Sequence, residues 1–221
     1  MLSFSLADIL CRVLILVIVF PAHELAHAVA ATRFGDPTPR EHGRLTLNPF
    51  KHLDLIGSVL FIFVGVGWAS TPVNPANFGE RRRLKMGIVS LAGPLTNLAL
   101  AVVGTIPLYL FHLAPITAST NPVYPDPAYF LTLFVFLNLL LAVFNMIPIA
   151  PLDGAQVLGA LLGGAAAEAF DAFQRYGSFA LIILVFILPL MGFNLLIFLT
   201  RYFVLPVLQL LFIGLPIAPA G

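Results

Sequence analysis

Two histidines and a glutamate, His23, Glu24 and His27, form the pattern His-Glu-x-x-His in the sequence. On a helix this spacing places both imidazoles one turn apart on the same face, where they can bind one zinc ion. Glu24 is then placed to act on the water of that metal. The motif lies in an apolar stretch over 9–31, where such polar residues are costly unless they serve a function. It therefore predicts a metal centre rather than a set of satisfied core histidines.

The composition predicts a membrane protein with a single domain over residues 1–221. Hydrophobic residues make up 60% of the chain and charged residues 10%, and the mean hydropathy is +1.01. A soluble domain of this length cannot bury so much apolar surface. The net charge of +1 gives no indication of nucleic-acid binding, and the one cysteine, Cys11, excludes a disulfide within the chain.

Five apolar stretches are candidate membrane segments: 9–31, 55–69, 86–111, 128–149 and 178–215. Pro189, Gly192 and Asn194 interrupt the last, which leaves open whether it forms one span or two helices. The second, with about fifteen residues, rises roughly 22 Å, less than the roughly 30 Å of hydrocarbon, so we expect a re-entrant hairpin. The predicted fold is an all-α polytopic bundle of about five to six transmembrane helices with a re-entrant, partly β-strand segment near the active site.

The distribution of charge predicts the orientation in the membrane. If 55–69 does not cross, His23, Asn97 and Asp153 all fall on one side of the bilayer. The loop 112–127 on the other side has no Lys or Arg. The basic residues that flank the motif side are Arg33, Arg40, Arg44, Lys51, Arg81, Arg82, Arg83 and Lys85. The positive-inside rule then makes the motif side cytoplasmic.

Asp153 is the candidate for the third protein ligand that a catalytic zinc needs. Pro148 and Pro151 must end or distort the fourth apolar helix, which leaves extended backbone that can turn the carboxylate inward. The spacing equally allows Asp153 to cap a helix that begins near Ala155. Three asparagines are open to two interpretations as well, because a polar residue in an apolar stretch is either functional or an ordinary interhelical contact. They are Asn97 and the pair Asn138 and Asn145, which share a helix face.

The segments HELAH, AGPLTN and NMIPIAPLDG, in this order, resemble the site-2 protease family of intramembrane zinc metalloproteases. The resemblance covers roughly residues 8–165, with C-terminal helices expected at about 178–215. The stretch 43–73 is similar to the compact bacterial branch, and neither a PDZ nor a CBS module is expected. The last motif ends Asp-Gly-Ala-Gln, where many members have a second glycine and a basic residue, which puts no ligand in doubt.

The resemblance implies a role for each candidate residue. His23, His27 and Asp153 are expected to bind one catalytic Zn²⁺, and Glu24 is expected to be the general base. Two asparagines match polar positions near the active site of the family, Asn97 and Asn145. Asn145 is expected to support the scissile carbonyl or its oxyanion.

The expected function is regulated intramembrane proteolysis, which is hydrolysis of peptide bonds within or near transmembrane segments of membrane proteins. The expected partners are transmembrane substrates and the lipid bilayer, with a homo-oligomer left open. The expected location is the plasma membrane of a prokaryote, as a multi-pass protein with its active site near the cytoplasmic side. A catalytically silent chaperone or scaffold is disfavoured because Glu24 and all three candidate ligands are present. A cation-binding transporter is disfavoured by the His-Glu-x-x-His spacing and the lack of a repeat pair.

A transmembrane substrate must unwind to expose its carbonyls, and the stretch 44–48 alternates with period two. It is either an edge strand that captures the unwound segment or a short amphipathic surface hairpin. The histidines on its two sides, His42 and His52, lack partners at metal-binding spacing and are expected at the surface.

Overall fold

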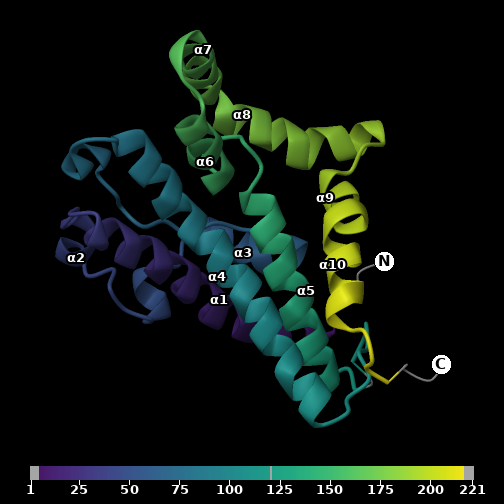
Figure 1. The fold of residues 1–221 in the computed structure, drawn as a ribbon. Coiled ribbons are helices and arrows are strands. Elements are labelled where there is room, and N and C mark those ends of the chain that lie inside the picture. The colour runs from purple at the N-terminus through teal and green to yellow at the C-terminus, as the bar shows by residue number, and fades with distance from the viewer. Residues whose placement is uncertain (1–4, 120, 217–221) are drawn as a thin grey trace.

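The computed structural model describes residues 5–119 and 121–216, and its regular elements there are all helical (Figure 1). Three helices are long and apolar enough to cross a membrane: α1 (Leu6–Arg33), α4 (Arg82–Leu110) and α5 (Pro127–Asn145). The shorter α-helices are α2 (Thr38–Glu41), α3 (Leu55–Val64), α6 (Asp153–Leu161), α7 (Gly164–Gln174), α8 (Gly177–Ile182), α9 (Leu195–Leu199) and α10 (Leu205–Leu211). Short 3₁₀ or π segments complete the chain: η1 (Pro49–Lys51), η2 (Pro75–Phe78), η3 (Ile183–Ile187), η4 (Leu188–Met191) and η5 (Thr200–Val204).

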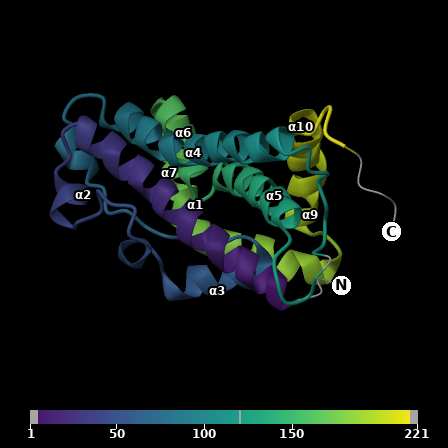
Figure 2. The ribbon, with the colours of Figure 1, turned by 90° about the horizontal axis from the view of Figure 1, so that it is seen from below.

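Helix α4 is the central element of the bundle, because it packs against α1, α5 and α6 (Figures 1 and 2). Ile15 and Val19 of α1 and Leu137 of α5 are buried in the common core. The outer faces of the long helices remain apolar, as at Ile18 of α1 and Val103 of α4, which are half exposed. Apolar residues on both the inner and the outer face are what a helix bundle in lipid requires.

The C-terminal apolar run, for which the sequence left one or two helices open, forms two helical arms, Gly177–Met191 and Leu195–Leu211. Gly192 adopts a left-handed conformation (φ 93°) and Asn194 caps the next helix by accepting a hydrogen bond from the N–H of Ile197. The first arm is bent by 63° from α7, and the second packs against α5. The described residues give three candidate spans, or four if the bent pair is one span. The expected five to six are not reached because the bends and the short α3 interrupt the remaining apolar runs.

The stretch 53–69 forms a hairpin of a helix and an extended return. Helix α3 ends at Gly65 (φ 91°), and the chain then runs back until Ala69 forms an antiparallel bridge with Leu53. Gly57 and Gly67 lie in contact, and a Cβ on Gly67 would collide with the carbonyl of Gly57. The two ends of the stretch therefore lie side by side, as the predicted hairpin requires.

The expected β-strand does not form in the described part of the chain, where the bridge between Leu53 and Ala69 is the extent of the β structure. The stretch 44–48 is instead hydrogen-bonded to the turn that follows it. The side chain of Asn48 caps η1 by accepting a hydrogen bond from the N–H of Phe50. His52 is 2% exposed, and its Nε2 lies 2.8 Å from the carbonyl oxygen of Thr46. The expectation that His52 lies at the surface is therefore wrong, whereas His42 is exposed.

Candidate metal centre and active-site cavity

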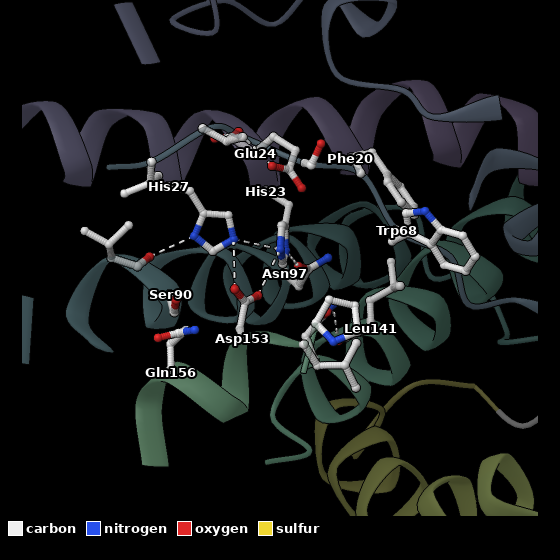
Figure 3. Close-up of a pocket in the computed structure, with 18 of the residues that line it drawn as sticks. Phe20, His23, Glu24, His27, Trp68, Ser90, Asn97, Leu141, Asp153 and Gln156 are labelled. Carbon is white, nitrogen blue, oxygen red and sulfur yellow. Dashed lines mark hydrogen bonds and ion pairs between the residues drawn. The ribbon is translucent and has the colours of Figure 1, made fainter. Parts of the chain in front are cut away.

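The side chains of His23, His27 and Asp153 converge on one point (Figure 3). The two imidazole Nε2 atoms are 3.0 Å apart. Asp153 Oδ2 lies 3.3 Å from Nε2 of His23, and Asp153 Oδ1 lies 3.4 Å from Nε2 of His27. All three offer ligand atoms that lie within 4.8 Å of one another. The structure thus brings together the three residues that the sequence predicts as ligands.

Asp153 reaches this point because the chain breaks between α5 and α6. Helix α5 ends at Asn145, and Pro148 and Pro151 lie in the loop that follows, as predicted. Asp153 is the first residue of α6, and the cap residue is Leu152, which makes no side-chain capping bond. The Asp153 carboxylate is therefore not used as a helix cap and faces the histidines instead.

The loop before Asp153 is held from outside by Gln174, at the end of α7. The side-chain oxygen of Gln174 accepts a hydrogen bond from the N–H of Ala150 (2.6 Å), and its amide nitrogen donates to the carbonyl of Pro148 (2.9 Å). Gly177 packs directly on the same loop, since a Cβ there would lie 2.7 Å from the carbonyl oxygen of Ala150. The C-terminal segment thereby positions the backbone that presents Asp153.

Helix α4 contacts both histidines and orients their imidazole rings. A Cβ at Gly93 would collide with both imidazoles, so only glycine leaves room for them. The carbonyl oxygen of Val89 lies 2.8 Å from Nδ1 of His27. A carbonyl can only accept, so Nδ1 carries a proton, and in the neutral imidazole Nε2 of His27 then has the free lone pair. Nδ1 of His23 is hydrogen-bonded to Oδ1 of Asn97, another residue of α4.

The chemistry of these donors fits a zinc ion. Two imidazole nitrogens and one carboxylate are a set that binds catalytic zinc and leaves a fourth position open. The lone pair of His27 Nε2 faces the carboxylate of Asp153, and two acceptors at this distance repel each other unless a cation lies between them. The residues present are therefore suited to hold the metal.

Glu24 is 5% exposed and lies beside the histidines on α1. The hydroxyl of Thr71 donates a hydrogen bond to its Oε2 (2.7 Å). Thr71 belongs to the extended segment 67–73, which begins in the extended return of the α3 hairpin and lines the cavity. Sequence reasoning missed Thr71, because nothing in its local pattern indicates a contact with a helix so far away along the chain.

Asp36, just after α1, is hydrogen-bonded to the part of the chain that follows the segment 67–73. It is fully buried and accepts hydrogen bonds from the N–H of Asn74 (2.8 Å), the amide of Asn77 (2.6 Å) and Thr38 (2.6 Å). Burial opposes ionisation, but these hydrogen bonds outweigh it, so the pKa of Asp36 lies below its ordinary value of 3.8. Asp36 was also missed, since a lone acidic residue after a helix resembles many surface residues.

The candidate metal ligands, Glu24 and Thr71 line a common cavity of about 550 Å³. All six predicted site residues line it: His23, Glu24, His27, Asn97, Asn145 and Asp153. The amide nitrogen of Asn145 donates to the carbonyl of Leu141 (3.0 Å), on its own helix. Trp68 also lines the cavity and is 43% exposed.

Comparison with known proteins supports a hydrolytic metal centre. The sequence profile of peptidase family M50 matches residues 114–188. The chain is 38% identical over 185 residues to the Bacillus subtilis protein named "Putative zinc metalloprotease YwhC", which covers 80% of each protein. It is 33% identical over 177 residues to Rip2 of Mycolicibacterium smegmatis, which has the same description, and this covers 76% of the chain and 62% of Rip2.

A shorter match of 42% identity over 73 residues links the chain to MJ0611 of Methanocaldococcus jannaschii, over 33% of the chain and 32% of that protein. No solved structure matches the chain significantly. The match to YwhC extends over four fifths of both sequences. The chain therefore belongs to peptidase family M50, the site-2 protease family of metallopeptidases.

Proposed function

We propose that the protein is a zinc endopeptidase that cleaves transmembrane proteins within or near their membrane segments. The observation that carries the proposal is the convergence of His23, His27 and Asp153, with Glu24 in the same cavity, inside a bundle of apolar helices. The relatives named as zinc metalloproteases support zinc as the metal. His23, His27 and Asp153 would hold this ion.

When bound, zinc would supply Lewis acidity, which makes a coordinated water more acidic and polarises a carbonyl oxygen. Glu24 is the group that moves the proton. Its carboxylate accepts a proton from the attacking water as the water oxygen bonds to the scissile carbonyl carbon. It then donates that proton to the leaving nitrogen as the C–N bond breaks, so that the products are a carboxylate and an amine. The Thr71 hydroxyl keeps the carboxylate of Glu24 oriented during this exchange.

Asn145 is proposed to stabilise the oxyanion that forms during attack. Its side chain lines the cavity, and one N–H of its amide is used by the carbonyl of Leu141. The second N–H is available to donate to a carbonyl oxygen of the substrate. A donor that faces the developing negative charge contributes more to the transition state than to the bound substrate.

The substrate is proposed to bind along the extended segment 67–73. Apart from the bridge at Ala69, this segment makes no backbone–backbone hydrogen bond with the described part of the chain. Its residues after the buried Gly67 therefore offer C=O groups and, except at Pro72, N–H groups. An unwound substrate can pair with such an edge as an added strand. Thr71 of this segment contacts Glu24, which places the captured backbone next to the proposed base. This assigns to 67–73 the role that the sequence pattern suggested for 44–48.

The α3 hairpin is proposed to enter and leave the membrane on the same side. The bridge between Leu53 and Ala69 supports this arrangement, because the two ends of the hairpin meet. With α3 not crossing, α1 and α4 carry their site residues at the same membrane depth. The basic residues that surround the hairpin make that side cytoplasmic. The protein is then a multi-pass protein of a prokaryotic plasma membrane.

The proposal is tested with purified protein in proteoliposomes that contain a single-span reporter substrate. We expect about one zinc per chain and cleavage of the reporter that stops when a chelator removes the metal and returns when zinc is restored. His23→Ala should abolish bound zinc, since two protein ligands rarely hold it tightly. Asp153→Ala should weaken binding and eliminate turnover. Full zinc and full cleavage by Asp153→Ala would show that another residue is the third ligand.

A further inference from the structure

We propose that Asn138 is a positioning residue that acts through Asn97 to hold His23 in the tautomer able to bind the metal. This inference rests on the proposed zinc site. Asn138 lies on α5, Asn97 on α4 and His23 on α1, so the relay joins the three long helices. Both asparagines are fully buried, so no solvent competes for their hydrogen bonds.

The relay begins at the backbone of α5. The side-chain nitrogen of Asn138 lies 2.8 Å from the carbonyl oxygen of Phe134. A carbonyl oxygen only accepts, so the NH₂ end of the Asn138 amide must face it. The Oδ1 atom of Asn138 is therefore turned in the opposite direction, toward α4.

The orientation of the Asn138 amide in turn fixes the orientation of the Asn97 amide. Oδ1 of Asn138 lies 3.2 Å from Nδ2 of Asn97 and can only accept, so Asn97 must present its NH₂ end to Asn138. Oδ1 of Asn97 then faces Nδ1 of His23, to which it is hydrogen-bonded. An acceptor at this position requires a proton on Nδ1. A neutral imidazole carries one N–H, so Nε2 of His23 is left with the lone pair that a metal needs.

The tautomers of the two histidines are thus fixed by different hydrogen-bond partners. The backbone carbonyl of Val89 fixes His27 directly, and its acceptor role does not depend on any other side chain. His23 depends on an amide that can turn over, because Asn97 alone could present either its oxygen or its NH₂ group. If Asn97 turned over, its NH₂ group would favour a lone pair on Nδ1 and a proton on Nε2, where the metal must bind. Asn138 removes this second state.

The expected effect of Asn138→Leu is a mixture of His23 tautomers and weaker metal binding. Loss of a partner behind a metal-bound histidine typically lowers metal affinity by about 10–100-fold. A plain interhelical contact between Asn97 and Asn138 makes a different prediction: Asn138→Leu would lower stability but leave the tautomer and the zinc affinity unchanged.

The test uses the full-length protein and measures the tautomer and the metal separately. In zinc-free protein labelled with ¹⁵N-histidine, the ring nitrogen shifts of His23 are assigned by their absence in His23→Asn. Wild type should show the proton on Nδ1, and Asn138→Leu should show both tautomers. Competition with a chelator should then give a zinc Kd about 10–100-fold higher for Asn138→Leu.

Two further variants separate tautomer control from general damage. Asn97→Asp replaces the amide with a carboxylate that only accepts, so the double variant Asn97→Asp/Asn138→Leu should regain most of the zinc affinity. Thr132→Val removes a hydroxyl of α5 that lies outside the relay, donates to the carbonyl of Ala128 and accepts from the N–H of Ile116. This variant should leave the zinc Kd unchanged. If Asn138→Leu does not fold, Asn138→Ser carries the same measurements.

An Asn138 variant with wild-type zinc affinity and a single Nδ1–H tautomer would overturn the inference while leaving the proposed zinc site intact. Failure of the wild-type protein to bind zinc would instead overturn the proposed function on which the inference rests.

Discussion

The hydroxyl of Thr71 lies 2.7 Å from Oε2 of Glu24, which joins the extended segment 67–73 to the helix that carries both histidines. The same hydroxyl lies 3.1 Å from the backbone carbonyl oxygen of Glu24, and its single hydrogen serves these two acceptors. The orientation of the proposed base is therefore linked to the segment on which the substrate is proposed to bind. A shift of this segment changes the position of the carboxylate as well.

Removal of this hydroxyl should slow catalysis without removing the metal. Thr71→Val keeps the shape of the side chain but leaves the Glu24 carboxylate without its donor, and a hydrogen bond to a charged group contributes about 1.5–3 kcal/mol. We expect kcat for the reporter substrate to fall by about tenfold or more. Thr71→Ser retains the donor and should keep most of the activity. Equal rates for the valine and serine variants would show that the hydroxyl does not position Glu24.

The contact of Gln174 with the loop 148–150 predicts that a residue of the C-terminal segment affects the metal. Gln174→Leu removes both hydrogen bonds to the backbone that precedes Asp153. We expect a zinc affinity lower by about tenfold, as for other residues that orient a ligand. The matched control is Gln209→Leu, which removes an exposed glutamine from α10. If both variants bind zinc as wild type does, the loop does not need Gln174.

Asp36 predicts a dependence of stability on pH. Its pKa is lower in the folded protein than in the unfolded chain, so its stabilising contribution is present above about pH 4 and is lost as the pH falls through the depressed pKa. Asp36→Asn should lower the free energy of unfolding by about 1–3 kcal/mol at pH 7. Unfolding by SDS in mixed micelles at a series of pH values should show this difference shrinking at acidic pH. A difference that is constant between pH 7 and pH 3 would contradict the proposed role of the carboxylate.

The path of the α3 hairpin is tested by labelling with an impermeant thiol reagent. In a Cys11→Ser background, Glu41→Cys and Glu80→Cys should both react from the cytoplasmic side, since they flank a segment that does not cross. Asn121→Cys, in the loop between α4 and α5, should react from the opposite side. Labelling of positions 41 and 80 from opposite sides would show that the hairpin crosses the membrane.

The candidate ligands could be predicted from the sequence because their signals are local. The spacing of His23 and His27 places both on one helix face, and the prolines around Asp153 break α5 where a loop is required. The break at Gly192 and Asn194 was predicted for the same reason. In each case the conformation depends on neighbours in the chain.

The supporting contacts could not be predicted, because they depend on residues from distant segments. Thr71 reaches Glu24, and Gln174 reaches Ala150, only after the helices have packed. The alternation over 44–48 left open an edge strand or a short surface hairpin, and in the structure Asn48 caps η1 at the end of that stretch. The extended segment 67–73 has no alternation, and at its start Gly67 makes a close contact with Gly57 that the local sequence pattern does not indicate. A count of apolar runs gives more candidate spans than the three or four in the described residues, since it does not register bends between short helices.

The most direct test of the account is cleavage of the reporter substrate by Glu24→Gln in proteoliposomes, with the bound zinc measured in the same preparation. Glutamine keeps the size and polarity of the side chain but cannot accept a proton from water. We predict nearly unchanged zinc and a turnover lower by at least roughly a hundredfold. Cleavage at the wild-type rate by a zinc-loaded Glu24→Gln variant would contradict the proposed mechanism.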